Sequence, residues 1–151
     1  MTKLRTLTVP DVLWINLQLT GSPQQYNFAT LEEGTFYQFK SGTNNDLAGQ
    51  AARLLTGFTR LAPMSTGNAS TAFIAALAFL EMNGHRLELS DETAVAWLSG
   101  IGSSMEAGKN SINGVISASD DHDDHNEVET SDIVMGLIHR FPTTLTALQS
   151  H

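Results

Sequence analysis

One segment of the sequence, residues 69–83, is hydrophobic around most of a helical circumference. A surface helix of a globular protein carries an apolar stripe on one side only, so a helix with a much wider apolar surface is expected inside the core. Asn83-Gly84 ends the segment with two residues that tolerate positive φ, as helix C-termini do. We therefore expect a central helix here, whose apolar set is Phe73, Ile74, Leu77, Ala78 and Leu80.

The remaining sequence predicts an irregular all-α bundle of about six to seven helices around that central helix. Thr8 and Pro10 mark a helix start, and Gly21 marks its end. The stretch 86–89 alternates apolar and polar residues but is too short to build a sheet. For residues 102–119 the sequence does not decide between helix and loop, because Gly, Ser and Asn fill more than half of the positions. Apolar periodicity predicts further helices over 31–39, 46–61, 90–100 and 131–141.

Length and charge restrict the function classes. A chain of 151 residues is expected to form a single domain over residues 1–151. Its 16 acidic and 8 basic residues give a net charge of −8, which repels phosphate backbones and anionic headgroups, so we expect no nucleic-acid or membrane partner. The absence of Cys excludes disulfides and thiolate chemistry. With neither a long apolar run nor a secretory signal, a soluble cytoplasmic protein is expected.

Most of the surplus negative charge lies in one segment, about residues 117–130. Residues 1–116 hold 9 acidic and 7 basic residues, whereas residues 117–151 hold 7 acidic residues and only Arg140 as a base. Because this segment has almost nothing to bury, we expect a mobile surface loop. His122 and His125 lie three apart among carboxylates and are metal candidates for Zn²⁺ or Ni²⁺. The alternative is a solvated acidic loop that attracts cations loosely.

The short turn before the central helix has the outline of an anion site. Gly67-Asn68 runs straight into the helix, so several free backbone amides and the positive end of the helix dipole point at one spot. The alternative is an ordinary capped helix start, which is the commoner meaning of a Gly before a helix.

A longer pattern around this turn resembles the motif of the Fic/Doc (death-on-curing) family. The segment reads Ala62-Pro63-Met64-Ser65-Thr66-Gly67-Asn68-Ala69-Ser70-Thr71 and continues into an Ala/Leu/Phe-rich helix that ends in Asn-Gly. The family motif reads His-Pro-Phe-x-(Asp/Glu)-Gly-Asn-(Lys/Gly)-Arg-Thr and is followed by a similar helix. The resemblance spans about residues 7–101 and implies an irregular helical bundle of the Fic/Doc type.

The resemblance also shows which chemical groups this chain lacks. In the family the His is a general base, the acid holds Mg²⁺ on the nucleotide phosphates, the Gly-Asn amides bind an anion and the Arg grips a phosphate. These His, acid and Arg positions are occupied here by Ala62, Thr66 and Ser70. A positioned general base contributes ~10²–10⁴-fold to a rate, and an electrostatic contact to the transferred group ~10²–10³-fold. No catalytic residue is therefore assigned.

The resemblance thus implies a protein that has lost nucleotidyl and phosphoryl transfer. We expect a module that binds a protein partner, or weakly binds a small anion or nucleotide, and that needs no cofactor. The alternative is a divergent, toxin-like transferase that moves AMP or phosphate from a nucleotide to a protein hydroxyl, and only this alternative requires ATP and Mg²⁺. A third possibility is a metal-responsive module that uses the acidic loop. The expected anion-binding residues are Gly67, Asn68, Ala69, Ser70 and Thr71.

A few other side chains are candidates for function. His85 and His139 could replace the missing base, but His85 follows the far end of the central helix, about one helix length from the turn. Trp14 and Trp97 are expected in the core. The family has a flap before the motif that docks the target segment, and residues 34–45 lie in the corresponding part of this chain. The aromatic residues there, Phe36, Tyr37 and Phe39, are candidates to line a partner groove, with core packing as the alternative.

Overall fold

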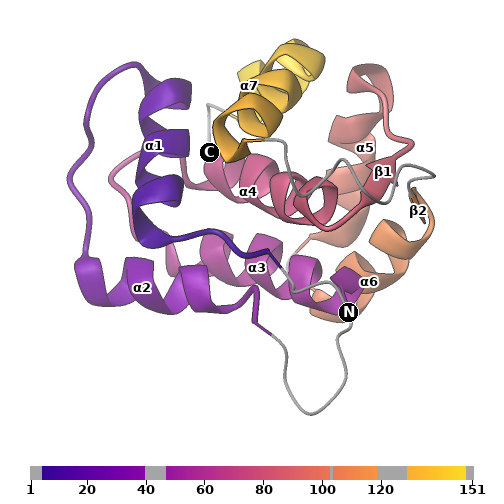
Figure 1. Ribbon diagram of the computed structural model, residues 1–151, viewed down its shortest axis with the longest axis horizontal. Coiled ribbons are helices and arrows are strands. Elements are labelled where there is room, and N and C mark those ends of the chain that lie inside the picture. Colours follow the sequence, from indigo (N-terminus) through magenta and orange to yellow (C-terminus); the bar gives the residue numbers. More distant parts are fainter. Residues whose placement is uncertain (1–4, 40–46, 103, 119–128, 149–151) are drawn as a thin grey trace.

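The computed structural model describes residues 5–39, 47–102, 104–118 and 129–148. Within these residues the chain forms eight helices and two three-residue strands (Figure 1). In chain order they are α1 (Val9–Thr20), α2 (Phe28–Phe36), α3 (Leu47–Leu61), α4 (Asn68–Met82), β1 (His85–Leu87), α5 (Asp91–Ile101), α6 (Met105–Asn113), β2 (Ile116–Ala118), α7 (Thr130–Arg140) and α8 (Pro142–Leu148). The fold class is all-α, as predicted.

Helix α4 is the central helix of the bundle, which confirms the prediction for residues 69–83. Every side chain from Ser70 to Leu80 is buried. Helices α1, α3 and α7 pack around α4 in different directions, and β1 and α8 also contact it (Figure 1). Phe73 of α4 meets Phe141, which follows α7, edge to face with ring centroids 5.1 Å apart. The hydrophobic residues around α4 form one buried cluster that extends from Leu7 to Leu145.

Helix α1 has the limits that its sequence predicts. The Thr8 hydroxyl accepts a hydrogen bond from the Asp11 amide at 3.1 Å, and the Asp11 carboxylate accepts one from the Thr8 amide at 2.9 Å. This reciprocal capping box satisfies two amides that have no partner inside the helix. At the other end, Gly21 adopts a left-handed φ of 79° and its amide donates to Leu17 O.

Helix α2 starts three residues before the predicted segment 31–39 and also ends three residues before the end of that segment. Asn27 accounts for the early start, because its Oδ1 accepts a hydrogen bond from the Thr30 amide at 3.0 Å and caps the helix. Two glycines let α2 and the turn after it approach α3 closely. A Cβ on Gly34 would lie 3.0 Å from the Phe58 ring, and a Cβ on Gly57 would collide with the Tyr37 ring.

Residues 102–119, for which the sequence does not decide between helix and loop, contain α6, and the expectation that the stretch 86–89 is too short for a sheet needs a correction. Trp97 of α5 donates from Nε1 to Ser111 O of α6 at 3.2 Å, which ties these two helices together. The stretch judged too short for a sheet contributes β1, which pairs antiparallel with β2 in the register His85 to Ala118. The partner strand lies about thirty residues later in the chain. Local alternation of apolar and polar residues does not reveal such a partner.

The last predicted helix is followed by a further short helix, α8. Helix α7 ends at Arg140, and Pro142 takes the first position of α8, where a proline needs no amide partner. Asp91 caps α8 from the start of α5: its carboxylate oxygens accept hydrogen bonds from the amides of Thr143 at 3.1 Å and Thr144 at 2.8 Å. Partial removal from water raises the pKa of Asp91, but the hydrogen bonds from Thr144 and Thr143 outweigh it and lower that pKa overall.

None of the described helices combines the length and the hydrophobicity that crossing a lipid bilayer requires. The described ion pair between α4 and α7 joins Glu81 Oε1 to Arg140 Nη1 at 2.9 Å. Burial raises the pKa of Glu81, and the nearby Arg140 guanidinium only partly offsets this. Because both side chains are partly exposed, the pair adds little to the stability of the bundle.

Candidate functional site

The segment that resembles the Fic/Doc motif forms the turn between α3 and α4, which we call the motif turn (residues 62–71). Ala62 ends α3 with a left-handed φ of 47°, a conformation that costs a residue with a Cβ about 1–2 kcal/mol. Gly67 precedes α4 with φ 77°, and no side chain caps the helix start. The link between α3 and α4 thus begins and ends with a left-handed residue, one of which is not a glycine.

Asn68 holds the turn closed with its own side-chain amide. Its Oδ1 accepts from the Met64 amide at 2.9 Å, and its Nδ2 donates to the Met64 carbonyl at 2.8 Å. The side chain therefore binds the backbone inside the turn. In this arrangement the Asn68 side chain has a structural role, and its backbone amide at the start of the helix is the part that could serve the predicted anion binding.

Asn16 of α1 holds the same turn from outside. The Asn16 side chain is 1% exposed. Its Nδ2 donates to Thr66 O and to Thr71 Oγ1, both at 3.0 Å. A Cβ on Gly67 would lie 2.8 Å from Thr20 Cγ2 and 3.0 Å from Asn16 Nδ2, so only glycine fits here. The turn is therefore built jointly by α1 and α4.

The two hydroxyl side chains at the family's acid and Arg positions are both engaged within the protein. Thr66 is exposed, and its Oγ1 donates to Gln24 Oε1 at 2.9 Å. Ser70 is 2% exposed, and its Oγ donates to Gly67 O at 3.2 Å. Ala62 is exposed and carries no polar group. The motif turn contains no residue that titrates near neutral pH.

The predicted anion-binding residues lie together at the start of α4, although they are not equivalent. The Thr71 amide donates to Gly67 O at 2.9 Å, and the Thr71 hydroxyl accepts from Asn16. Gly67, Asn68 and Ala69 are partly exposed, whereas Ser70 and Thr71 are buried. An anion at this end of the helix would therefore meet the amides of the first turn and no cationic side chain of the motif turn.

The connection between α1 and α2 runs antiparallel to the motif turn. Tyr26 and Met64 form an isolated β-bridge. The Asn27 amide donates to Pro63 O at 3.0 Å, and the Ser65 amide donates to Gln25 O at 2.9 Å. Among the described residues, segment 24–27 therefore borders the motif turn. Of the segment 34–45, which corresponds to the family's flap, residues 34–39 belong to α2 and the turn after it, and residues 40–45 lie outside the described residues.

A hollow of about 330 Å³ lies between α1, this connection and the motif turn, and we call it the α1 hollow. Its walls are mostly apolar, and none of its described lining residues is charged. The lining consists of Leu13, Trp14, Asn16, Leu17, Pro23, Gln24, Tyr26 and Met64. The prediction that Trp14 belongs to the core is met only in part, because the partly buried side chain packs on the core and also lines this hollow.

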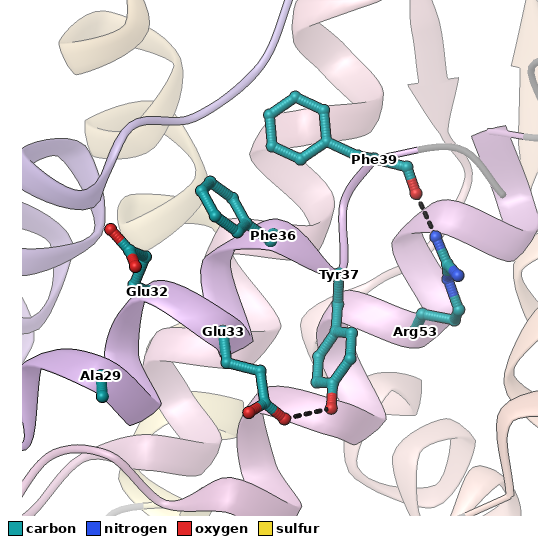
Figure 2. Close-up of a pocket in the computed structure, with 7 residues that line it drawn as sticks. All are labelled: Ala29, Glu32, Glu33, Phe36, Tyr37, Phe39 and Arg53. Carbon is teal, nitrogen blue, oxygen red and sulfur yellow. Dashed lines mark hydrogen bonds between the residues drawn. The ribbon is translucent and has the colours of Figure 1, made fainter.

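A second hollow, of about 480 Å³, lies on the α2–α3 face, and we call it the aromatic hollow. Phe36 and Phe39 are 55% and 41% exposed, and their ring centroids are 5.6 Å apart in an edge-to-face arrangement. Figure 2 shows the two rings side by side, with Glu32 next to Phe36 and with Tyr37 bonded to Glu33 at 2.8 Å. Arg53 of α3 donates to the Phe39 carbonyl at the other end.

The histidines named as substitutes for the base do not lie at the motif turn. His85 begins β1, beyond the far end of α4, and partial burial lowers its pKa. Its Nδ1 is buried, and no described residue hydrogen-bonds to it. His139 is exposed and precedes Arg140. Arg140 pairs with Glu81, which lies thirteen residues after Asn68 and therefore about 20 Å along α4 from the motif turn.

The metal candidates His122 and His125 lie outside the described residues. Within the residues that the structure describes, no group of three or more His, Asp or Glu side chains is placed to hold a metal ion.

Sequence reasoning missed Asn16, Gln24 and Tyr26, which complete the motif turn and the α1 hollow. Asn16 lies among the apolar residues of α1 and is the one buried amide there. That position was the available signal, because a polar residue inside an apolar helical face needs a hydrogen-bond partner. Comparison of the chain with family models, with curated proteins and with solved structures finds no match.

Proposed function

We propose that this chain is a Fic/Doc-like helical protein that has lost nucleotidyl and phosphoryl transfer and acts by binding. The family resemblance rests on the motif turn and on the apolar helix that follows it. The placement of that turn at the start of a central, largely buried helix supports the proposal. Because a fold alone does not determine a function, the side chains of the turn decide between transfer and binding.

The observation that carries the proposal is the state of three side chains in the motif turn. Ala62 has no group that could accept a proton, Thr66 is bonded to Gln24, and the Ser70 hydroxyl is bonded to Gly67 O in a buried position. A general base, a metal-binding carboxylate and a phosphate-binding cation are missing together. This favours a pseudoenzyme over a divergent transferase, which would need all three functions from residues elsewhere.

The experiment is a transfer assay with labelled ATP, Mg²⁺ and candidate protein targets. We expect no labelled protein. Robust labelling that depends on the chain would overturn the proposal and establish the divergent transferase, with ATP and Mg²⁺ as its cofactors. The matched control for a trace contaminant is the variant Gly67→Val, which alters the motif turn: a label that persists in this variant does not come from the turn.

The proposal includes weak binding of a small anion by the free backbone amides at the start of α4. Calorimetry with ATP, AMP and inorganic phosphate measures it. We expect weak binding or none, because no cationic side chain of the motif turn supplements the amides. A sub-micromolar affinity for ATP would contradict the loss of nucleotide function.

We propose the aromatic hollow as the docking surface for a protein partner. Exposed Phe36 and Phe39 give this face a contiguous apolar area of the kind that marks interaction sites, and aromatic residues often dominate interface energetics. Glu32 and Phe28 lie one and two turns before Phe36 on the same side of α2 and extend the surface.

A comparison of variants tests this assignment. A partner retained by the wild-type chain should be lost by the double variant Phe36→Ser and Phe39→Ser and kept by Tyr26→Ser. Tyr26 is a suitable control because it is also an exposed aromatic residue but lies at the other hollow. Equal retention by all three chains would show that the aromatic hollow is not the docking surface.

A further inference from the structure

The α1 hollow has the features of a small-molecule site. Its volume of about 330 Å³ lies at the lower end of the range of ligand pockets, which are typically lined by apolar side chains with a few polar groups. Trp14 and Tyr26 supply aromatic walls from two different segments, α1 and the connection after it. Because none of the described lining residues is charged, the hollow suits an uncharged ligand.

The polar group at this site is Asn16. It lines the hollow although it is 1% exposed, so the hollow reaches to the edge of the core. Both hydrogens of Nδ2 are used, by Thr66 O and Thr71 Oγ1. No hydrogen bond from a described residue reaches Oδ1, and Oδ1 is not among the fully buried atoms that lack a partner, so this acceptor stays accessible. A ligand that hydrogen-bonds Asn16 must therefore bring a donor.

We propose that the α1 hollow binds a small, uncharged aromatic molecule that carries one N–H or O–H donor, which it directs to Asn16 Oδ1. Trp14, Tyr26 and Met64 contact the ring. This inference does not depend on the loss of transfer activity, since no residue at the family's base, acid or Arg position lines the hollow. A transfer assay with a positive result would leave it unchanged.

The matched probes are indole and benzofuran, which share one shape and differ in the donor. In ¹H–¹⁵N NMR titrations, indole should shift the Trp14 Nε1–H and the Asn16 side-chain amide signals, and a Trp97→Phe variant separates the two tryptophan signals. We expect saturable indole binding at about 1 mM and an affinity for benzofuran that is lower by about tenfold. Equal affinities would overturn the role of Asn16, and shifts confined to other residues would overturn the site.

Variants on one helix locate the binding. Leu17 lines the hollow at its rim and is 36% exposed, so Leu17→Trp should fill the hollow and abolish indole binding. Gln18→Trp adds the same ring at the next, exposed position outside the hollow and should leave binding unchanged. Tyr26→Ala is a second variant that does not touch the core and should weaken binding severalfold. Indole binding that survives both Leu17→Trp and Tyr26→Ala would refute the proposal.

Discussion

Asn16 of α1 donates a hydrogen bond from Nδ2 to Thr71 Oγ1 of α4 at 3.0 Å, and both side chains are buried. The same nitrogen donates to Thr66 O, so one amide joins α1, the motif turn and the central helix. The pairing spans 55 residues of sequence. The shape of the motif turn therefore depends on α1, although the turn and the helix after it look like a self-contained motif in the sequence.

Replacing Asn16 with Ala is expected to destabilise the protein by about 1–3 kcal/mol, because Thr66 O and Thr71 Oγ1 lose a buried donor. Urea unfolding measures the change in the free energy of unfolding. Gln18→Ala, at an exposed position of the same helix, controls for helix propensity. Equal midpoints for the two variants would mean that this network does not contribute to stability.

Gly67→Ala should cost about 1–3 kcal/mol, since Ala would have to adopt φ 77° and its Cβ would lie 2.8 Å from Thr20 Cγ2. Gly100→Ala is the matched substitution in a different environment: it lies in α5 with open space around the new Cβ and should stabilise the protein by about 0.5–1 kcal/mol. Unfolding curves of the two variants should thus move in opposite directions, and a shift of both in one direction would refute the backbone argument.

Asp91 should make stability depend on pH. Its hydrogen bonds to Thr143 and Thr144 lower its pKa in the folded state below the reference value of 3.8. The stabilisation is therefore fully present above that reference value and is lost as the pH falls through the lowered pKa. Asp91→Asn should lower the Tm by a few degrees at neutral pH and by less in strong acid. The control is Glu92→Gln, at the next and exposed position: its Tm difference from the wild type should not become smaller in strong acid.

Replacing Phe36 or Phe73 with Ala should lower the stability of the protein by very different amounts. Phe36→Ala removes a ring that is 55% exposed and should cost at most about 1 kcal/mol, mainly through its contact with Phe39. Phe73→Ala opens a cavity in the core and should cost about 3–5 kcal/mol. Denaturant midpoints check both values. A large loss from Phe36→Ala would place this ring in the core and remove the reason to treat it as part of a docking surface.

The elements that the sequence predicts well are those with local causes. The apolar surface of α4 and the capping box at Thr8 are visible within a dozen residues, and the structure has both. Helix α2 lies three residues earlier than the predicted segment, because Asn27 caps its start, whereas the prediction rests on apolar residues such as Leu31 and Phe36. The short helix α8 is not predicted, because a Pro after an apolar helix usually marks its end, whereas here Pro142 starts a helix whose free amides Asp91 caps from α5.

The candidate site was predictable only in part for a related reason. The turn at Gly67 and its lack of acid–base residues can be read from the motif, but the α1 hollow depends on Tyr26 pairing with Met64 across 38 positions. No local pattern specifies such a pairing. Residues 22–26 are polar apart from Pro23 and Tyr26 and resemble an ordinary connection in the sequence, yet they form one wall of the hollow.

The backbone pairing between residues 24–27 and the motif turn has a consequence for kinetics. That wall of the α1 hollow is attached by a few main-chain hydrogen bonds, including those from Asn27 and Ser65, and it carries mostly exposed side chains. Segments of this kind open at lower free energy than a buried helix. The amides of Asn27 and Ser65 should therefore exchange with deuterium much faster than those in the middle of α4. A ligand could then enter the hollow by detachment of this connection while the core stays folded.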